Sequence, residues 1–355
     1  MIEMINQLIK KGFAYENNNH VYFEVKNFSD YGKLSNKKLE DLIAGSRVEI
    51  SHNKKSSEDF VLWKPSVKDE PFWDSPWGKG RPGWHLECSA MSKKYLGKEF
   101  DIHGGGIDLI FPHHENEIAQ SCGVTGCLPV RFWVHNGFVN IDKEKMSKSL
   151  GNFFTLRDIY KKFHPEALRL FLISSHYRSP IDFSIKNLED AEKVILRFYE
   201  ALDNAGSLVG DHNISLEEIK NHPFLAKCEG AMNDDFNTAV VVAHLNEESR
   251  GINSECSLIG SGEENKKNLA LRLSTFKFVG ELLGLLTGSP EKIRQEIFNI
   301  KKTELDLDVR KIECLINDRN EARKNKNWDR ADKCRDELTQ MGVVLEDTSQ
   351  GTEWK

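Results

Sequence analysis

A helix is predicted at the start of the chain. Apolar residues recur there at helical spacing, and Gly12 is placed to end the helix: Ile2, Ile5, Leu8 and Ile9. Strands are predicted where apolar and polar residues alternate: residues 20–25, 47–51 and 132–141. Between them, residues 63–83 are dense in Trp, Pro and Gly, which indicates an ordered covering loop.

Helical spacing dominates the second half of the chain. From about residue 165 onward, long segments repeat apolar residues every three or four positions, as in 166–175 and 188–202. Residues 308–340 are polar and highly charged, and they predict a helical hairpin. The pattern predicts a mixed α/β part followed by an all-α part.

The composition excludes several classes of protein. Of 355 residues, 39% are apolar and 29% charged, which disfavours disordered, collagen-like and membrane proteins. The seven cysteines are scattered without a CxxC pair, as expected in a reducing compartment, so we expect a cytoplasmic protein. The net charge of −6 gives no sign of a nucleic-acid partner.

Histidines concentrate in one window of the sequence. Five of the twelve lie between His85 and His135. We expect Pro112 to begin a helix, which puts His113 and Glu117 on one face, four residues apart. With the thiol of Cys88 they form a plausible zinc ligand set. The alternative is that the charged groups serve the helix dipole and that Cys88 is a small buried hydrophobe.

Two further segments suggest nucleotide chemistry. Gly104, Gly105 and Gly106 follow a predicted strand end and would let the backbone approach a phosphate or purine, with Asp108 accepting from a ribose or amine. A plain tight turn is the alternative. In residues 144–152, Lys145 and Lys148 lie on a loop with two serines, where they could follow charge on a breaking polyphosphate. An exposed polar turn would explain this loop equally well.

Taken together, these segments resemble a known family. KMSKS at 145–149 is similar to the second signature of class I aminoacyl-tRNA synthetases. The combination with GWHLECSAM (83–91), DIHGGGIDL (101–109) and FPHHENEIAQS (111–121) resembles the cysteinyl-tRNA synthetases. Other similar stretches are spread along the whole chain: 39–50, 59–65, 73–84, 175–184, 231–239, 319–338 and 342–354.

The resemblance assigns roles to individual residues. It implies that Cys88, His113 and Glu117 are three ligands of a zinc ion that selects the thiol of L-cysteine. The substrate and ATP sites would be formed by Trp84, His85, His103, Gly104, Gly105, Gly106, Asp108 and Lys148. Lys148 would stabilise the leaving pyrophosphate, Lys145 would be a second catalytic residue, and magnesium would accompany ATP.

The resemblance also implies a domain order. We expect a partial Rossmann-type catalytic domain with an incomplete parallel sheet, a stem-contact linker, a helical bundle that binds the anticodon side of tRNA, and a small helical anticodon-recognition region. The expected bounds are 1–150, 151–210, 211–304 and 305–355. Residues 311–335 hold eight Lys or Arg against five Asp or Glu, which with Trp328 suits stem phosphates and a stacked base. A solvated charged helix is the alternative for this region.

One family signature, His-Ile-Gly-His, is not found in the sequence, nor is a fourth zinc ligand upstream of Cys88. We therefore expect this chain to lack the first βα unit of the Rossmann sheet. A missing N-terminal segment or a second chain would then supply that unit. Adenylate formation by this chain alone would then be impaired. Two functions remain at this point: a cysteine–tRNA ligase that acts on ATP, L-cysteine and tRNA(Cys), or a truncated paralogue that only binds tRNA.

Overall fold

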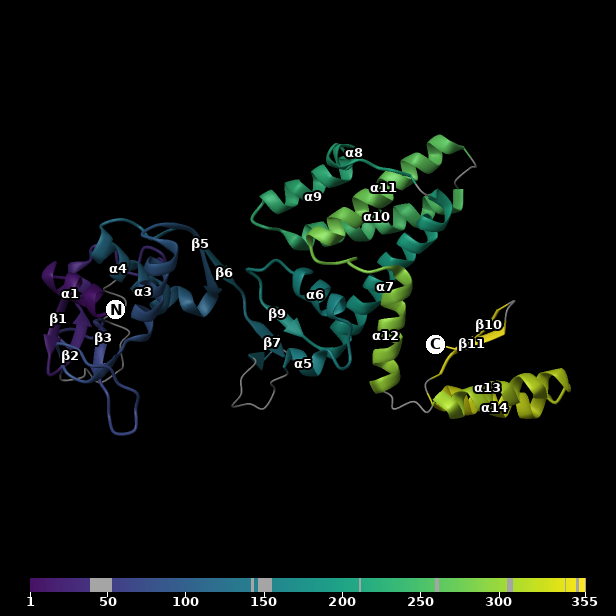
Figure 1. Cartoon of the computed structure of the whole chain (residues 1–355), viewed down its shortest axis with the longest axis horizontal. Helices are drawn as coiled ribbons and strands as arrows, with labels where there is room; N and C mark the ends of the chain where they lie inside the picture. The colour runs from purple at the N-terminus through teal and green to yellow at the C-terminus, as the bar shows by residue number, and fades with distance from the viewer. Residues whose placement is uncertain are drawn as a thin grey trace. The chain divides into compact units, whose positions relative to one another are not determined.

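The computed structural model describes most of the chain: residues 1–38, 53–141, 144–145, 155–210, 212–258, 262–304, 309–341, 343–348 and 351–354. The chain divides into two compact units (Figure 1). The first consists of Met1–Phe138 with Arg178–Pro180, and the second of Val139–Tyr177 with Ile181–Lys355.

An antiparallel sheet forms one side of the first unit. Its strands follow one another in space in the order of the sequence: β1 (Ala14–Asn17), β2 (His20–Phe23), β3 (Phe60–Pro65) and β4 (Gly80–Pro82). The helix α1 (Ile2–Lys10) packs its Ile5 and Leu8 into the same core as Phe23 and Leu62, all fully buried. Burial of this apolar stripe explains why the predicted helix forms.

Two predictions for this part of the chain are tested. The helix ends as expected: Gly12 has φ +77°, and the Phe13 N–H donates to the Leu8 carbonyl at 2.9 Å. The expected covering loop at 63–83 was wrong at both ends, because its flanks pair as β3 and β4. Trp63 of β3 and Trp77, in the connection between the two strands, lie buried against each other. The strand predicted at 47–51 lies outside the described residues.

Helix α3 (Trp84–Leu96) follows β4 directly and begins against the sheet. A side chain on Gly83 would collide with the Val61 carbonyl of β3, so only glycine lets the chain turn into the helix here. The Gly83 N–H donates to the Leu62 carbonyl at 2.9 Å. The start of α3 is therefore positioned by the sheet.

A parallel pair of strands completes the first unit. β5 (Phe100–Gly106) pairs with β6 (Val130–Asn136), and α4 (Glu115–Thr125) connects them. The strand predicted at 132–141 is divided: β6 ends at Asn136, and β7 (Val139–Ile141) belongs to the second unit. Gly137 lies at the break. A Cβ at this position would lie 2.4 Å from the Ser179 backbone, which is too close for any side chain.

The second unit is mostly helical (Figure 1). It contains a small sheet of β8 (Glu144–Lys145), β7 and β9 (Ile181–Phe183), in which β7 pairs with β9 in parallel. The helices are α5 (Leu156–Ile159), α6 (Pro165–Ile173), α7 (Ile185–Val209), α8 (Leu216–Lys220), α9 (Pro223–Asn233), α10 (Thr238–Leu258), α11 (Glu263–Leu282) and α12 (Pro290–Glu304). None of the helices in the described part of the chain is long and apolar enough to span a bilayer.

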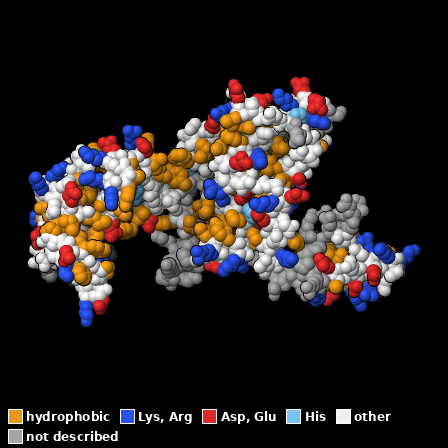
Figure 2. All heavy atoms as spheres, viewed as in Figure 1, with side chains coloured by type: hydrophobic (Ala, Val, Ile, Leu, Met, Phe, Trp, Pro, Cys, Tyr) orange, Lys and Arg blue, Asp and Glu red, His pale blue; other side chains and the backbone are white. Residues whose placement is uncertain are grey.

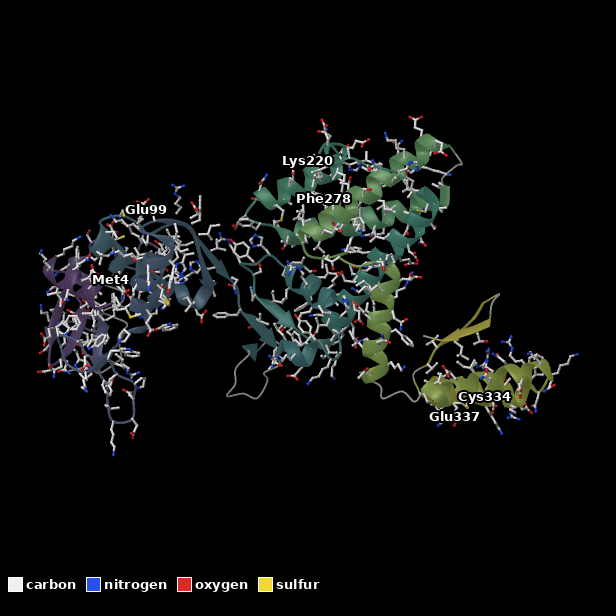
Figure 3. The ribbon with its side chains drawn as sticks, in the orientation of Figure 1. Met4, Glu99, Lys220, Phe278, Cys334 and Glu337 are labelled. Carbon is white, nitrogen blue, oxygen red and sulfur yellow. The ribbon has the colours of Figure 1, made fainter. Side chains whose placement is uncertain are left out.

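The C-terminal residues form a helical hairpin, as predicted. α13 (Val309–Lys324) packs against α14 (Trp328–Gln340) around a small core that includes Ile312, Ile316 and Leu338. Cys334 is buried on α14, whereas Glu337 on the same helix is exposed (Figure 3). A two-stranded hairpin follows, β10 (Leu345–Thr348) and β11 (Gly351–Trp354).

A buried carboxylate joins three parts of the second unit. Glu166, near the start of α6, accepts hydrogen bonds from the Tyr199 hydroxyl on α7 and from the Leu286 and Thr287 N–H groups before α12. The Thr287 hydroxyl donates to the same carboxylate at 2.7 Å. Since every donor points at one buried group, Glu166 holds α6, α7 and the 286–287 turn in register.

Removing this carboxylate is expected to destabilise the helical unit. Glu166→Ala would leave the buried Leu286 N–H, the Thr287 N–H and the buried Tyr199 hydroxyl without this acceptor, which should cost about 3 kcal/mol of unfolding free energy. Urea denaturation followed by circular dichroism measures the change. Glu189→Ala, at an exposed position of α7, is the control and should change stability by less than about 0.5 kcal/mol. Equal effects of the two variants would contradict the role of Glu166.

Candidate metal centre

Two helices of the first unit bring the predicted ligands together. α3 carries Trp84, His85 and Cys88 in its first two turns. His113 lies in a π-helical turn, Ile110–His114, and Glu117 in the first turn of α4. The prediction that Pro112 begins an α-helix was wrong. Phe111 before it is extended (φ −138°, ψ 130°), and regular α-helix starts only at Glu115.

The three predicted ligands lie close to one another. The Cys88 thiol, a His113 ring nitrogen and a Glu117 oxygen are all within 4.8 Å of each other. Nε2 of His113 is 2.8 Å from Oε1 of Glu117. That oxygen is nevertheless buried without a hydrogen bond, because the two groups are close but not aligned for one. A nitrogen and an oxygen in this arrangement are typical of two ligands facing a common cation.

Burial shapes the protonation of the three ligands. It raises the pKa of Glu117 to about 8 and raises the pKa of the Cys88 thiol, with the Glu117 charge adding to the latter. Burial lowers the pKa of His113. A cation among these groups would offset the cost of the buried negative charge on Glu117 and Cys88, and neutral His113 is in the form that binds metal.

Neighbouring aromatic rings orient His113. Its Nδ1 lies 2.7 Å from Nδ1 of His85, so one ring donates to the other and Nε2 of His113 is left to face Glu117. Burial and the nearby His113 lower the pKa of His85 to about 4. The Trp84 ring lies 4.4 Å from His113, centroid to centroid, although Trp84 itself is 61% exposed. The tautomer of a metal-binding histidine is commonly held in this way.

A second group shares Glu117. His103 on β5 and His114 offer ring nitrogens that lie within 4.8 Å of each other and of a Glu117 oxygen. His114 Nδ1 is 2.8 Å from His135 Nε2, and Trp133 stacks on His103. Of these residues, His103 was predicted from the sequence as a site residue, whereas His114, Trp133 and His135 were not. The cluster of five histidines was the signal, since two of these three residues belong to it.

The glycine run lies at the end of β5 beside these histidines. A Cβ on Gly105 would lie 2.9 Å from Cε1 of His114 and 3.0 Å from Leu109, so glycine lets His114 pack against the strand. Gly104 and Gly106 complete the strand end. Asp108 is exposed in a short 3₁₀ turn, Ile107–Leu109, and its carboxylate lies over Gly106.

The described residues do not test the two predicted phosphate-binding lysines. Lys145 is in β8 of the second unit, and its side chain is not described. Lys148 lies outside the described residues. Their contribution to a site with the histidine cluster therefore stays a prediction.

The first turn of α4 is held by a loop from far earlier in the chain. The Ser35 N–H and hydroxyl both donate to Oε2 of the fully buried Glu115, at 2.9 and 2.8 Å. The Tyr31 hydroxyl donates to Oδ1 of Asn116 at 2.5 Å. These bonds fix the backbone between His113 and Glu117.

The donor set fits zinc. It combines one thiol, one imidazole and one carboxylate, which are the three kinds of side chain that zinc accepts. The buried Oε1 of Glu117, without a hydrogen bond, is the observation that a bound cation would account for. Calcium and magnesium are disfavoured because they prefer oxygen ligands.

Family models match three stretches of the chain. Residues 1–193 match the catalytic domain of the class I tRNA synthetases of the C type, residues 227–287 the DALR domain, and residues 310–354 the cysteinyl-tRNA ligase anticodon-binding domain. The first match covers more than half of the chain. Together they confirm the predicted class I catalytic fold followed by a helical region.

Individual relatives agree along the full chain. The cysteine–tRNA ligase of Pelobacter propionicus is 46% identical over 373 residues, covering 100% of this chain and 75% of the relative. That of Geobacter sulfurreducens is 47% identical, covering 100% and 74%. That of Haemophilus influenzae is 49% identical, covering 100% and 73%.

Glycine at position 105 should be required for packing of the histidine cluster. Gly105→Ala is expected to displace His114 and to lower the unfolding free energy by about 2 kcal/mol, the usual cost of overpacking. Gly104→Ala is the matched control, because its Cβ would meet only the Val134 carbonyl at 3.4 Å, an ordinary contact. Thermal denaturation of both variants measures the difference. A Gly104→Ala variant that loses as much stability as Gly105→Ala would refute this account.

Proposed function

Because this chain belongs to the cysteine–tRNA ligase family, we propose that it uses ATP to activate L-cysteine as cysteinyl-adenylate and transfers the cysteinyl group to tRNA(Cys). The observation that carries the proposal is the approach of Cys88, His113 and the unbonded Glu117 oxygen at one buried point. The alternative of a tRNA-binding paralogue without catalysis is not favoured, since relatives similar along the whole chain are named as ligases.

In this proposal, Cys88, His113 and Glu117 hold one zinc ion. When bound, zinc supplies a preference for a thiolate over a hydroxyl, which separates cysteine from serine. A polar site that demands one kind of partner discriminates far more steeply than an apolar pocket can. No editing step is then required to exclude serine.

The neighbouring residues shape the amino-acid pocket. The exposed Trp84 ring lies beside His113, and His85 holds His113 through their 2.7 Å contact. His85 and His103 have lowered pKa values because of burial, so both are neutral near pH 7 and offer hydrogen bonds without adding charge. Because both histidines are neutral, neither repels the ammonium group of the substrate nor forms an ion pair with its carboxylate.

ATP is placed at the end of β5. Gly104, Gly105 and Gly106 allow a close approach of the nucleotide to the backbone, and exposed Asp108 is available to ribose or amine groups. Lys145 and Lys148 of the KMSKS sequence would stabilise the negative charge of the leaving pyrophosphate. Magnesium accompanies the ATP phosphates, and we place the reaction in the cytoplasm.

The C-terminal hairpin provides the tRNA contact. Lys and Arg side chains lie at intervals along α13 and α14 (Figure 2). Trp328, at the start of α14, is 59% exposed and can stack on an unpaired base. Phosphate neutralisation by the lysines and arginines would make binding dependent on salt. This local charge explains how an acidic protein binds RNA.

The metal ligands should be required for both zinc content and substrate choice. Cys88→Ser is expected to lower zinc from about one ion per chain to near zero, because a hydroxyl replaces the thiolate. Cysteine-dependent exchange between ATP and labelled pyrophosphate should fall with it. Elemental analysis and the exchange assay make the two measurements. Full zinc content in Cys88→Ser would show that the metal is held elsewhere.

Trp328 should contribute to tRNA binding and not to the activation of cysteine. Trp328→Ala is expected to weaken tRNA(Cys) binding about tenfold, in line with 1–3 kcal/mol per stacked base, and to leave cysteine-dependent exchange unchanged. Filter binding at two salt concentrations measures the affinity. The control is Trp73→Ala, at an exposed tryptophan (56%) of the first unit, which should not change tRNA affinity. An equal loss in both variants would argue against stacking at Trp328.

A further inference from the structure

A buried hydrogen bond joins the two helices that carry the candidate metal ligands. The Ser89 hydroxyl on α3 donates to Oε1 of Gln120 on α4 at 2.6 Å. Both residues are buried, Ser89 with 2% and Gln120 with 0% of its surface exposed. Ser89 is next to Cys88 in sequence, and Gln120 lies three residues, about one turn, after Glu117.

Ser89 and Gln120 are not of the side-chain types that usually bind zinc, which are Cys, His, Asp and Glu. The groups of potential ligand atoms in the described chain contain Cys88, His103, His113, His114 and Glu117. Ser89 instead directly follows the ligand Cys88 on α3, and Gln120 lies one turn after the ligand Glu117 on α4. The bond therefore connects the thiol side of the site to the imidazole and carboxylate side without entering it.

The spacing of the ligands depends on how α3 lies against α4. Zinc binds sulfur at about 2.3 Å and nitrogen or oxygen at about 2.0–2.2 Å, so a small shift between the helices breaks the set. Apolar packing has no direction and tolerates such a shift, whereas a short hydrogen bond fixes both distance and rotation. The Ser89–Gln120 bond supplies this directional restraint.

The unfavourable burial of the Gln120 amide supports a role for this residue in positioning its neighbours. Its Nε2 is buried and has no hydrogen-bond partner among the described residues. An unpaired buried amide destabilises the fold, so an apolar side chain of the same size would be better for stability alone. A residue that is unfavourable for stability but directional fits a role in placing its neighbours.

We propose that Ser89 and Gln120 are positioning residues that set the distance between the Cys88 thiol and the His113–Glu117 pair, and with it the affinity for zinc. The proposal rests on the proposed function, since it takes these three side chains as the zinc ligands. It assigns no contact with substrate to either residue. Loss of the bond weakens the metal centre while the fold persists.

The replacement Gln120→Met separates placement from stability. Methionine is similar in size to glutamine and carries no unpaired amide, so the unfolding temperature of the metal-free chain should stay equal or rise. The dissociation constant for zinc should increase about tenfold, within the range found when residues that support metal ligands are replaced. Competition with a chelating dye measures it on the full chain. An unchanged dissociation constant in Gln120→Met overturns the proposal.

Replacements at Ser89 give the conservative comparison. Ser89→Ala removes the donor and should weaken zinc about tenfold, whereas Ser89→Thr keeps the hydroxyl and should retain affinity even if its extra methyl lowers stability. Ser249→Ala is the matched control, a buried serine of the second unit, and should leave zinc affinity unchanged. Equal weakening in Ser89→Ala and Ser89→Thr would show general damage and overturn the proposal.

Cobalt substitution provides a readout independent of activity. The thiolate-to-cobalt absorption band of the wild-type chain reports the Cys88 contact, and it should weaken in Ser89→Ala and Gln120→Met. A wild-type chain that binds neither zinc nor cobalt overturns the proposed metal site itself. A wild-type chain that binds both, beside variants with unaltered affinity and spectrum, overturns only the positioning role.

Discussion

The buried carboxylate of Glu117 is the constraint on which the metal centre depends. It is 3% exposed, its Oε1 has no hydrogen bond, and burial raises its pKa to about 8. Such a group is costly in a folded protein unless a cation or a proton compensates it. The surrounding rings do not provide that compensation, because burial lowers the pKa values of the nearest histidines. A divalent cation held jointly with Cys88 would provide it.

The elements around Glu117 position the side chains that lie next to it. Gly83 lets α3 begin against β3, which places Cys88. Gly105 leaves room for His114 beside β5. Ser35 bonds Glu115 and so holds the first turn of α4. These positions are far apart in sequence, and each contributes a steric or directional restraint on the same small volume.

The sequence predicted the local elements well, because their signals are local. The helix at the start of the chain, the long helices after residue 165 and the C-terminal hairpin all follow from apolar spacing. The i, i+4 relation of His113 and Glu117 was likewise available, and the two side chains do meet. The prediction of one strand over 132–141 was wrong, because the structure has two strands there, β6 and β7. The alternation of apolar and polar residues continues across Gly137, so it does not reveal the break.

The sequence by itself therefore determined the family, the order of the structural elements and the chemical types of the candidate ligands. Only the tertiary structure decided which histidines surround Glu117, that Phe111 interrupts the helix before it, and that Ser89 bonds Gln120. The physical reason is the range of the interactions. Periodicity and turn residues act over a few positions, whereas the contacts at this site join α3, β5 and α4 through packing that no single segment specifies.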